Sequence, residues 1–342
     1  MLYKPFQLLW LTACILLLGA CGGSSKKTLV VYSPHGKELL GDFEKAFEKV
    51  NPDVDVQWLD MGSQEIFDRI RTESANPQAD LWWGAPATMF MRAESLGLLA
   101  SYKPIWASQV PLAAKSKTDS WYGTFSTPEV IAFNRNTLNE TTAPQDWSDI
   151  VSPEWKDKVV LRNPMASGTL RAIFCGMIEQ SVQRTGNEDS GWNWLKQLHA
   201  NGPDYAADPT QLYARLGSNK PMVTLWNMPD IVLQAEKYKY PFGYVFPKNG
   251  TIVVTDGIAL VKGSRQSELS KAFYEFVTTK ESLLLQAEKY YRIPARTDIP
   301  REQLPGWLKS ASYKTLDINW QQVANSEAQW MKQWDATIKS NP

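Results

Sequence analysis

The segment MASGTLRAIF, residues 165–174, combines the residue types best suited to binding chemistry in this chain. It places Ser167, Gly168 and Thr169 directly before an apolar helical pattern. A helix N-terminus leaves four backbone N–H groups unpaired and carries about half a positive charge, so an anion there gains direct hydrogen bonds. Glycine allows close approach of a ligand. The segment predicts either an anion site or an ordinary helix N-cap. An N-cap contributes about 1 kcal/mol of stability. Both interpretations can hold if one group caps the helix and other groups bind the anion.

Ser167 could also act as a nucleophile. The nucleophile elbow of α/β-hydrolases requires G-x-S-x-G and a later histidine. The stretch MASGT lacks the first glycine, and the one later histidine is His199. A secreted hydrolase is therefore the weakest alternative, and we expect no enzyme activity and no catalytic residue.

The chain has two histidines, His35 and His199. Neither belongs to an H-x-x-x-H or C-x-x-C pattern, so a zinc site lacks ligands and we expect no metal and no cofactor. His199 is expected on a helix face near the end of that helix. His35 lies in a strand-to-helix loop, where it could contact a ligand, cap the helix or lie on the surface.

Trp83 and Trp226 are the best ligand candidates among the 15 tryptophans, because each ends a strand-like run. Their faces could cover the apolar or ring portion of a solute, or a methylated ammonium through cation–π attraction. The other tryptophans, among them Trp330 and Trp334, are expected to pack in the core or on the surface.

Asp256 follows the apolar run IVVT. A buried carboxylate without a partner is costly, so Asp256 must have one. That partner is either an amine on a ligand or, as the simpler reading, a protein donor.

Alternating strand-like and helical segments position these residues. Strand-like stretches at LVVY, VDVQWL and ADLWW are separated by helical patterns at 39–50 and 63–74. This alternation predicts a mostly parallel sheet flanked by helices, with ligands at the carboxyl ends of the strands. The loops at those ends are SPHG (33–36), MGSQ (61–64) and GAPAT (84–88).

The second half of the chain repeats this pattern. PEVIAFN, KVVL and PMVTLW are strand-like, GTIVVTDGIALVKG is expected to cross between two lobes, and 268–279 to form a helix. We predict an α/β fold of two lobes, each a mixed, mostly parallel sheet flanked by helices, joined by extended hinge strands. The expected boundaries are a signal peptide at 1–20, a tether at 21–27, lobe 1 at 28–126 and 256–288, and lobe 2 at 127–255 and 289–342.

The first twenty residues have the pattern of a signal peptide, with Lys4, an apolar run at 8–18 and small residues before Cys21. The apolar run is about half the ~20 residues that a transmembrane helix needs. LGAC resembles the bacterial lipoprotein box, in which the cysteine is acylated, as with palmitate, and becomes the mature N-terminus. We expect a lipoprotein in the cell envelope, anchored through Cys21 on the periplasmic side of a membrane or on the outer cell surface. Only Cys175 would then remain, so no internal disulfide can form.

The charge balance excludes one class of partner. The chain has 36 basic and 36 acidic residues, and removing Lys4 with the signal peptide leaves 35 − 36 = −1. Nucleic-acid binding would require a basic surface. We expect a monomeric protein with a small-molecule solute as partner.

Four stretches, in this order and spacing, resemble a known family: LVVYSPHGKELLGDFEKAFE, GSQEIFDRIRTESANPQADLWWGAP, DWSDIVSPEWKDKVVLRNPMASGT and YVFPKNGTIVVTDGIALVKGS. With YYRIPAR near the end, they resemble the type II periplasmic solute-binding proteins and lipoproteins of ABC importers. The branch is the one with ferric-iron, hexose-phosphate and aminoethylphosphonate binders. The resemblance implies two α/β lobes that close on one small solute and deliver it to a membrane permease.

The resemblance also implies site residues. A phosphate- or phosphonate-bearing solute would place its anion on Ser167, Gly168 and Thr169. The other lobe would close from Ser33, Ser63 and Ala85. Further contacts are expected at His35, Trp83, Thr127, Trp226, Asn227, Asp256 and Tyr291.

Iron binders of this family use a loop histidine, a carboxylate after the third strand and two adjacent tyrosines. Here His35 lies one place early, Ala85 occupies the carboxylate position, and Trp226 and Asn227 replace the tyrosines. Since Fe(III) requires anionic oxygen ligands, iron is disfavoured. The first alternative to an anionic organic solute is a neutral sugar or oligosaccharide bound by Trp83 and Trp226; ferric iron comes third and a hydrolase fourth.

Overall fold

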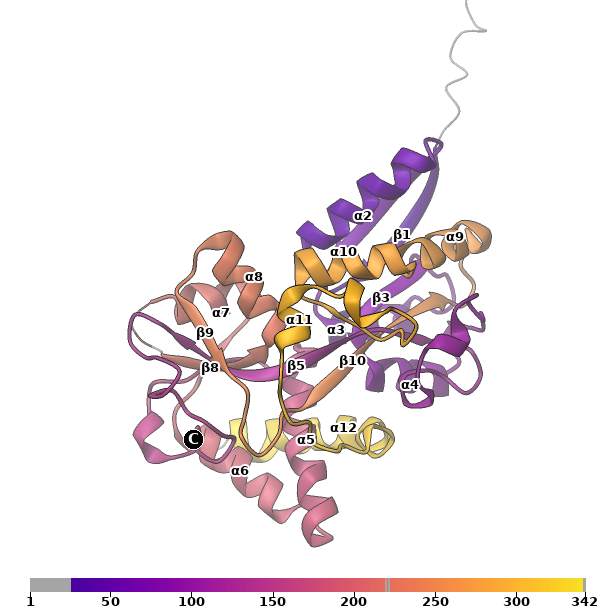
Figure 1. Ribbon diagram of the computed structural model, residues 1–342. Helices are drawn as coiled ribbons and strands as arrows, with labels where there is room; N and C mark the ends of the chain where they lie inside the picture. Colours follow the sequence, from indigo (N-terminus) through magenta and orange to yellow (C-terminus); the bar gives the residue numbers. More distant parts are fainter. Residues whose placement is uncertain (1–25, 219, 221, 341–342) are drawn as a thin grey trace, which may run out of the picture.

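The computed structural model describes residues 26–218, 220 and 222–340 (Figure 1). The predicted signal peptide, Cys21 and most of the tether lie outside the described residues. Within the described ranges, no helix has both the length and the apolar character needed to cross a membrane.

A sheet of nine strands runs through the molecule. Its order is β11 (Ile293–Pro294), β5 (Tyr122–Asn134), β10 (Val253–Val261), β3 (Leu81–Pro86), β1 (Lys27–Ser33) and β2 (Val54–Asp60). Beside this path, β4 (Leu99–Ala100) pairs with β10, whereas β8 (Val223–Asn227) and β9 (Phe242–Val245) pair with β5. A second sheet has two strands, β6 (Val160–Arg162) and β7 (Asp204–Ala206).

The sheet contains both parallel and antiparallel strand pairs, as expected for a mixed sheet. Pairing is parallel between β1, β2 and β3 and between β6 and β7. Every pairing that involves β5 or β10 is antiparallel. The first half of β5 pairs with β10 and β11, and its second half pairs with β8 and β9. One continuous strand therefore joins the two parts of the molecule.

Two hydrophobic clusters cover the two faces of the β1–β2–β3 region, which we call lobe 1 together with its helices. Adjacent strand residues point to opposite faces, so Trp82 and Trp83 belong to different clusters. The Trp83 cluster takes in α2 (Lys37–Val50), α9 (Ser267–Val277) and the end of α10 (Lys280–Tyr290). The Trp82 cluster takes in α3 (Ser63–Thr72) and α4 (Ala87–Ser95). Helix α2 forms its apolar stripe from Leu39, Leu40, Phe43 and Phe47, and each fully buried phenylalanine contributes roughly 2 kcal/mol.

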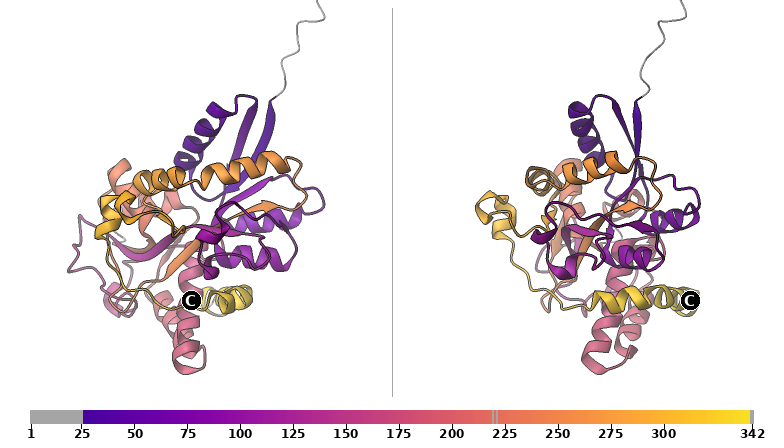
Figure 2. Two further views of the ribbon diagram at one scale, coloured as in Figure 1. Left: turned by 45° about the vertical axis from the view of Figure 1, so that its right-hand side comes forward. Right: turned by 90° about the vertical axis from the view of Figure 1, so that its right-hand side faces the viewer.

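A third cluster, around the second half of β5, defines lobe 2. It takes in α5 (Gly168–Thr185), α6 (Asp189–Ala200), α7 (Pro209–Leu216), α8 (Met228–Tyr238) and α12 (Trp320–Trp334). Trp330 and Trp334 are buried in this core, as packing residues. Figures 1 and 2 show α5, α6 and α12 together at one end of the molecule and α2 and β1 at the other. Shorter elements are α11 (Gly306–Ser310), η1 (Ala107–Gln109), η2 (Leu112–Ala114), η3 (Pro153–Trp155), η4 (Arg301–Gln303) and η5 (Asp335–Lys339).

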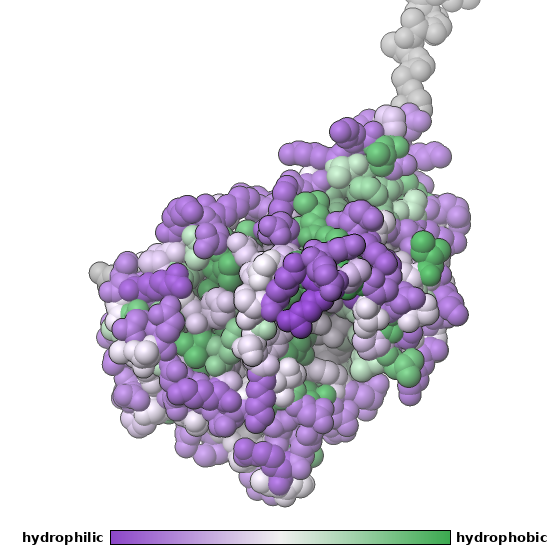
Figure 3. All heavy atoms as spheres, in the orientation of Figure 1, coloured by the Kyte–Doolittle hydropathy of each residue, from purple (hydrophilic) through white to green (hydrophobic). Residues whose placement is uncertain are grey.

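The surface seen in Figure 3 is mostly hydrophilic, with small separate hydrophobic areas. The α4 and α12 helices join the lobes through Arg92 of lobe 1 and the buried Glu327 of lobe 2, whose Nη1 and Oε1 lie 2.6 Å apart.

Candidate functional site

The first turns of α3, α4 and α5 meet at Gly168, the first residue of α5. A Cβ built on Gly168 would lie 2.8 Å from Pro86 Cδ and 2.9 Å from Ser63 Oγ. Pro86 directly precedes α4, and Ser63 is the first residue of α3. Lobe 2 therefore touches lobe 1 at this point, and the approach requires a residue without a side chain at position 168.

Ser167 is the N-cap of α5, and its Oγ accepts a hydrogen bond from the Leu170 N–H at 3.2 Å. The capping interpretation therefore holds for the Ser167 hydroxyl. Helix geometry leaves the N–H groups of Gly168 and Thr169 without acceptors inside α5. Because α3 and α4 also direct their N-termini here, three helix dipoles place positive partial charge around one point.

The turn between β3 and α4 has an unusual backbone. Gly84 has φ +99°, and a Cβ at this position would lie 2.2 Å from Nε2 of His35. Ala85 has φ +129°, which strains a non-glycine residue by about 1–3 kcal/mol. This conformation directs the Ala85 N–H toward Asp256 Oδ1, at 3.3 Å.

His35 packs edge-on against Trp83, with ring centroids 5.7 Å apart, and tilted against Phe125, at 4.9 Å. Its Nε2 is buried and has no hydrogen-bond partner among the described residues. Burial, with a smaller contribution from the positive charge of Arg292, holds the pKa of His35 well below its usual value. The ring is therefore neutral at pH 7. It does not cap α2, whose N-cap is Gly36 without a side-chain hydrogen bond.

A cluster of ionisable side chains, the Arg292 cluster, lies where β5 and β10 run between the lobes. It consists of Arg292, Asp230, Asp256 and Glu129. Arg292 Nη2 donates to Asp230 Oδ1 at 2.9 Å, and its guanidinium lies over the Phe125 ring at 5.2 Å. Asp256 accepts from Thr127 Oγ1 at 3.2 Å in addition to the Ala85 N–H. Burial raises the pKa of Asp256 to about 6, although Arg292 opposes this.

Strand register explains how the cluster assembles. Phe125, Thr127 and Glu129 alternate along β5 and share one face. Asp256 of β10 is opposite Phe125, and Asn227 of β8 is opposite Glu129. Burial and the negative charge of Asp256 raise the pKa of Glu129 well above its usual value. The Glu129 Oε2 has no hydrogen-bond partner within the described part of the chain.

Residues 76–321 match the family model for bacterial extracellular solute-binding proteins. The chain belongs to this family.

Relatives of this solute-binding protein span nearly its whole length. A Sinorhizobium fredii protein, named as an ABC transporter periplasmic-binding protein, is 24% identical over 91% of this chain and 87% of its own. A Salmonella typhimurium protein named for 2-aminoethylphosphonate binding is 24% identical over 95% of this chain and 97% of its own.

Solved structures share the fold. AfuA from Actinobacillus pleuropneumoniae, with fructose-6-phosphate bound, superimposes with a TM-score of 0.78 at 23% identity over 92% of this chain and 99% of that chain. A ferric binding protein from Campylobacter jejuni superimposes with a TM-score of 0.75 at 21% identity over 90% of this chain and 98% of that chain. The predicted periplasmic-binding-protein fold is thereby confirmed.

The two tryptophans expected to contact solute are buried in this binding protein. Trp83 is fully buried beside Phe43 and Phe273 in lobe 1. Trp226 is 4% exposed, and its Nε1 donates to Tyr213 Oη at 3.1 Å. Every residue of β3 and of β8 is buried, so both indoles lie in the cores and not at an exposed strand end.

Three other expected site residues have structural contacts. Ser33 is fully buried, and its Oγ accepts the His35 N–H at 3.3 Å. Asn227 caps α8, with its Oδ1 accepting the Asp230 N–H at 2.9 Å. Tyr291 packs against Trp307, with ring centroids 5.6 Å apart, so its neighbour Arg292 is the residue that enters the cluster.

Sequence reasoning missed Glu129, Asp230 and Arg292. Glu129 had a usable signal, since it is a charged residue inside the apolar strand PEVIAFN. Arg292 follows Tyr291, which ends α10 with φ +56°, and that turn could not be read from residue types alone.

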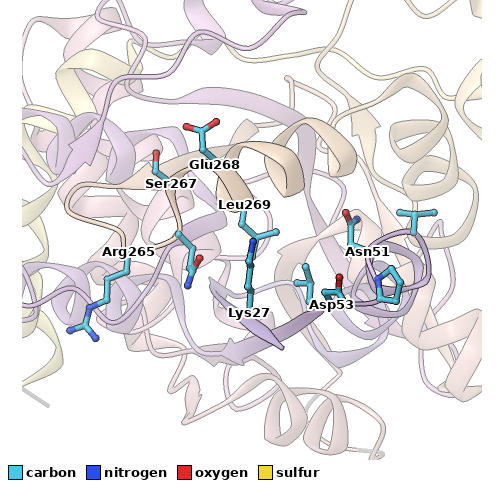
Figure 4. Close-up of a pocket in the computed structure, with 11 residues that line it drawn as sticks. Lys27, Asn51, Asp53, Arg265, Ser267, Glu268 and Leu269 are labelled. Carbon is cyan, nitrogen blue, oxygen red and sulfur yellow. The ribbon is translucent and has the colours of Figure 1, made fainter. Parts of the chain in front are cut away.

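Other candidate features lie outside this region. His199 lies near the end of α6, and its Nδ1 is 3.2 Å from Oη of Tyr205 in β7. In the described residues, no three His, Cys, Asp or Glu side chains are grouped as metal ligands. A hollow of about 720 Å³ lies at the opposite end of β1 from Ser33; Figure 4 shows it lined by the start of β1, the turn after α2 and the start of α9, including Lys27, Asp53 and Glu268.

Proposed function

We propose that this protein captures a small anionic organic solute, bearing phosphate or phosphonate, between its two lobes and delivers it to the permease of an ABC importer. The observation that carries the proposal is the convergence of α3, α4 and α5 at Gly168. Backbone N–H groups at helix N-termini bind phosphate without requiring a positively charged side chain.

The position of this convergence supports the proposal. Ser63 and Pro86 come from lobe 1, whereas Gly168 comes from lobe 2. An anion held by both sets of N–H groups would link the lobes, so binding and closure favour each other. Within the closed site water is excluded, which strengthens each hydrogen bond.

The relatives support the same class of solute. The Salmonella relative is named for a phosphonate, and the AfuA structure holds a sugar phosphate. The S. fredii relative is named as an ABC transporter component, which supports a permease partner and a role without covalent chemistry. A neutral-sugar receptor would need exposed aromatic faces, and the indoles of Trp83 and Trp226 are buried.

The predicted lobe boundaries belong to this proposal. We propose that the two lobes move as two bodies. Lobe 1 consists of residues 28–126 and 256–288, and lobe 2 consists of residues 127–255 and 289–342. Separate hydrophobic clusters in the two parts support this division. The monomeric state belongs to the proposal as well, because one copy supplies both lobes.

Anchoring through an acylated Cys21 is also proposed, from the signal sequence alone. Labelled palmitate should be incorporated into the wild-type protein in cells and absent from Cys21→Ser. Release of the wild-type protein by salt washing of membranes would contradict the anchor.

A thermal-shift screen tests the solute class. The purified protein is heated with 2-aminoethylphosphonate, fructose 6-phosphate, free fructose and Fe(III) citrate. A ligand present at 100 times its Kd stabilises the folded state by about 2.7 kcal/mol. We expect a higher Tm with at least one phosphorus compound and no change with free fructose. A shift with fructose or iron alone would overturn the proposal.

A further inference from the structure

We propose that Glu327 of α12 is a positioning residue for the anion site: it holds α3, α4 and α5 against one another and so fixes how their N-termini face a solute at Gly168. This inference rests on the proposed function and adds to it a residue of the C-terminal helix. We therefore expect changes on α12 to affect solute affinity and stability separately.

Glu327 is a buried carboxylate in contact with α4. It is 1% exposed, and its Oε1 accepts a hydrogen bond from Nη1 of Arg92 at 2.6 Å. The Arg92 guanidinium in turn lies over the ring of Phe67 in α3, with its Cζ 4.3 Å from the ring centroid. Phe67 and Arg92 both lie in the second turn of their helices. One carboxylate on α12 therefore holds α3 and α4 through a single guanidinium.

A second guanidinium, that of Arg171 in α5, lies near the same carboxylate. Arg171 is 4% exposed, and its Nη2 donates to the backbone oxygen of Met165 at 3.0 Å. Its Nε is buried without a hydrogen-bond partner in the described part of the chain. Burial lowers the pKa of Arg171, and the negative charge of Glu327 is the strongest influence that opposes this. Glu327 therefore balances the charge of the side chain that holds the loop leading into Ser167.

These contacts tie together the three helices that form the candidate site. The first turns of α3, α4 and α5 meet at Gly168, and α12 packs against both α4 and α5. Because a helix rises about 1.5 Å per residue, Phe67, Arg92 and Arg171 lie only about 5–8 Å along the helix axes from the helix starts. Removing the Glu327 charge leaves the guanidiniums of Arg92 and Arg171 to repel each other. The resulting shift reaches the N–H groups proposed to bind the anion.

Calorimetric titration compares Glu327→Gln with a control on the same helix, Met331→Ala. Met331 lies one turn further along α12 and is 1% exposed in the lobe 2 core, so its truncation also destabilises the protein. The probe is whichever of 2-aminoethylphosphonate and fructose 6-phosphate raises the Tm of the wild-type protein. At a temperature where circular dichroism shows every variant folded, Glu327→Gln should bind the probe at least tenfold more weakly than wild type. Met331→Ala should bind it within threefold of wild type.

Arg92→Met tests whether Glu327 acts through its partner on α4. This variant should also lose at least tenfold in affinity for the same probe. The double variant Arg92→Met/Glu327→Gln should bind within threefold of the weaker single variant, because both changes break one contact. Losses that multiply in the double variant would contradict a route through Arg92.

Hydrogen–deuterium exchange without solute gives a readout that does not need the proposed function. Peptides covering 63–68, 87–92 and 165–172 should exchange at least fivefold faster in Glu327→Gln and at the wild-type rate in Met331→Ala. Unchanged exchange at these helix starts, or equal loss of affinity in the two α12 variants, overturns the positioning role and leaves the anion site standing. If no phosphorus compound binds, the proposed function fails, and the exchange rates alone decide whether Glu327 positions the helix starts.

Discussion

Gly168 of lobe 2 lies against Pro86 of lobe 1 so closely that a Cβ at position 168 would be 2.8 Å from Pro86 Cδ. This is closer than van der Waals contact allows. The contact therefore exists only while position 168 has no side chain, so a substitution there tests the proposed closure of the lobes.

Gly168→Ala should reduce solute affinity at least tenfold, because the added methyl group meets Pro86 and Ser63 when the lobes are together. If the lobes move as proposed, the protein without solute relieves the clash by opening slightly. Its Tm should therefore change by less than about 2 °C, equivalent to under 1 kcal/mol for a chain of this size. Calorimetric titration and a thermal melt measure the two effects. Gly41→Ala is the matched control, since a Cβ there meets nothing within 4 Å; equal loss of affinity in both variants would refute the closure argument.

Gly84 and His35 should be energetically coupled. Gly84→Ala forces a methyl group into the imidazole ring, at 2.2 Å from Nε2, and strains a backbone with φ +99°. In a His35→Ala background only the strain remains. The destabilisation caused by Gly84→Ala should therefore be smaller by about 1–3 kcal/mol in that background. Urea denaturation of the four proteins gives the coupling energy, and additive effects would show that the ring can move aside freely.

The ion pair between Arg92 and Glu327 should stabilise the association of the lobes. Glu327 is 1% exposed, and Arg92 also lies over the Phe67 ring at 4.3 Å. Glu327→Gln leaves the Arg92 guanidinium without its anion and should lower the free energy of unfolding by about 3 kcal/mol. This value is at the low end for buried ion pairs, because Arg92 retains some contact with solvent. Glu140→Gln breaks the exposed pair with Arg135 and should cost under about 1 kcal/mol. Denaturant titrations measure the free energy of unfolding of both variants. An equal loss in the two would show that the Arg92–Glu327 pair stabilises the protein no more than an exposed ion pair does.

The pH dependence of stability should include Asp256. Its pKa is about 6 in the folded protein against 3.8 ordinarily, so between these values the unfolded chain loses a proton that the folded chain keeps. Stability therefore falls as pH rises from 4 to 6, by up to roughly 3 kcal/mol, and this contribution is constant above that range. Asp256→Asn removes the titration while keeping an acceptor for the Ala85 N–H. The stability of the variant relative to wild type should increase over this pH range, as measured by denaturation at pH 4.5 and 7, whereas a constant difference would contradict the assignment.

Much of the fold could be predicted from periodicity. The stripe from Leu39 to Phe47 predicted α2, and the apolar run before Asp256 predicted an extended strand, which is β10. The direction of β10 could not be predicted in this way, because an apolar run has the same pattern in parallel and antiparallel pairs.

The candidate site was predictable where local rules apply. The hydroxyl of Ser167 and the glycine beside it indicated a helix start, which is where they lie. The indole of Trp83 was expected at a cleft rim but is buried, because helices cover both faces of β3 and every residue of that strand lies in a core. The Arg292 cluster draws on residues separated by up to 163 positions, from Glu129 to Arg292. Strand register places Glu129 and Asp256, whereas Asp230 lies on α8 and Arg292 follows α10, so only the tertiary fold brings them together.

Strand β10 also affects the order in which this protein can fold during synthesis. It lies between β3 and β5, although both are made more than 100 residues before it. Until Val261 is available, β3 keeps an open edge, and such edges readily pair with other chains. Lobe 1 therefore cannot be completed before the 127–255 part of lobe 2 has been synthesised.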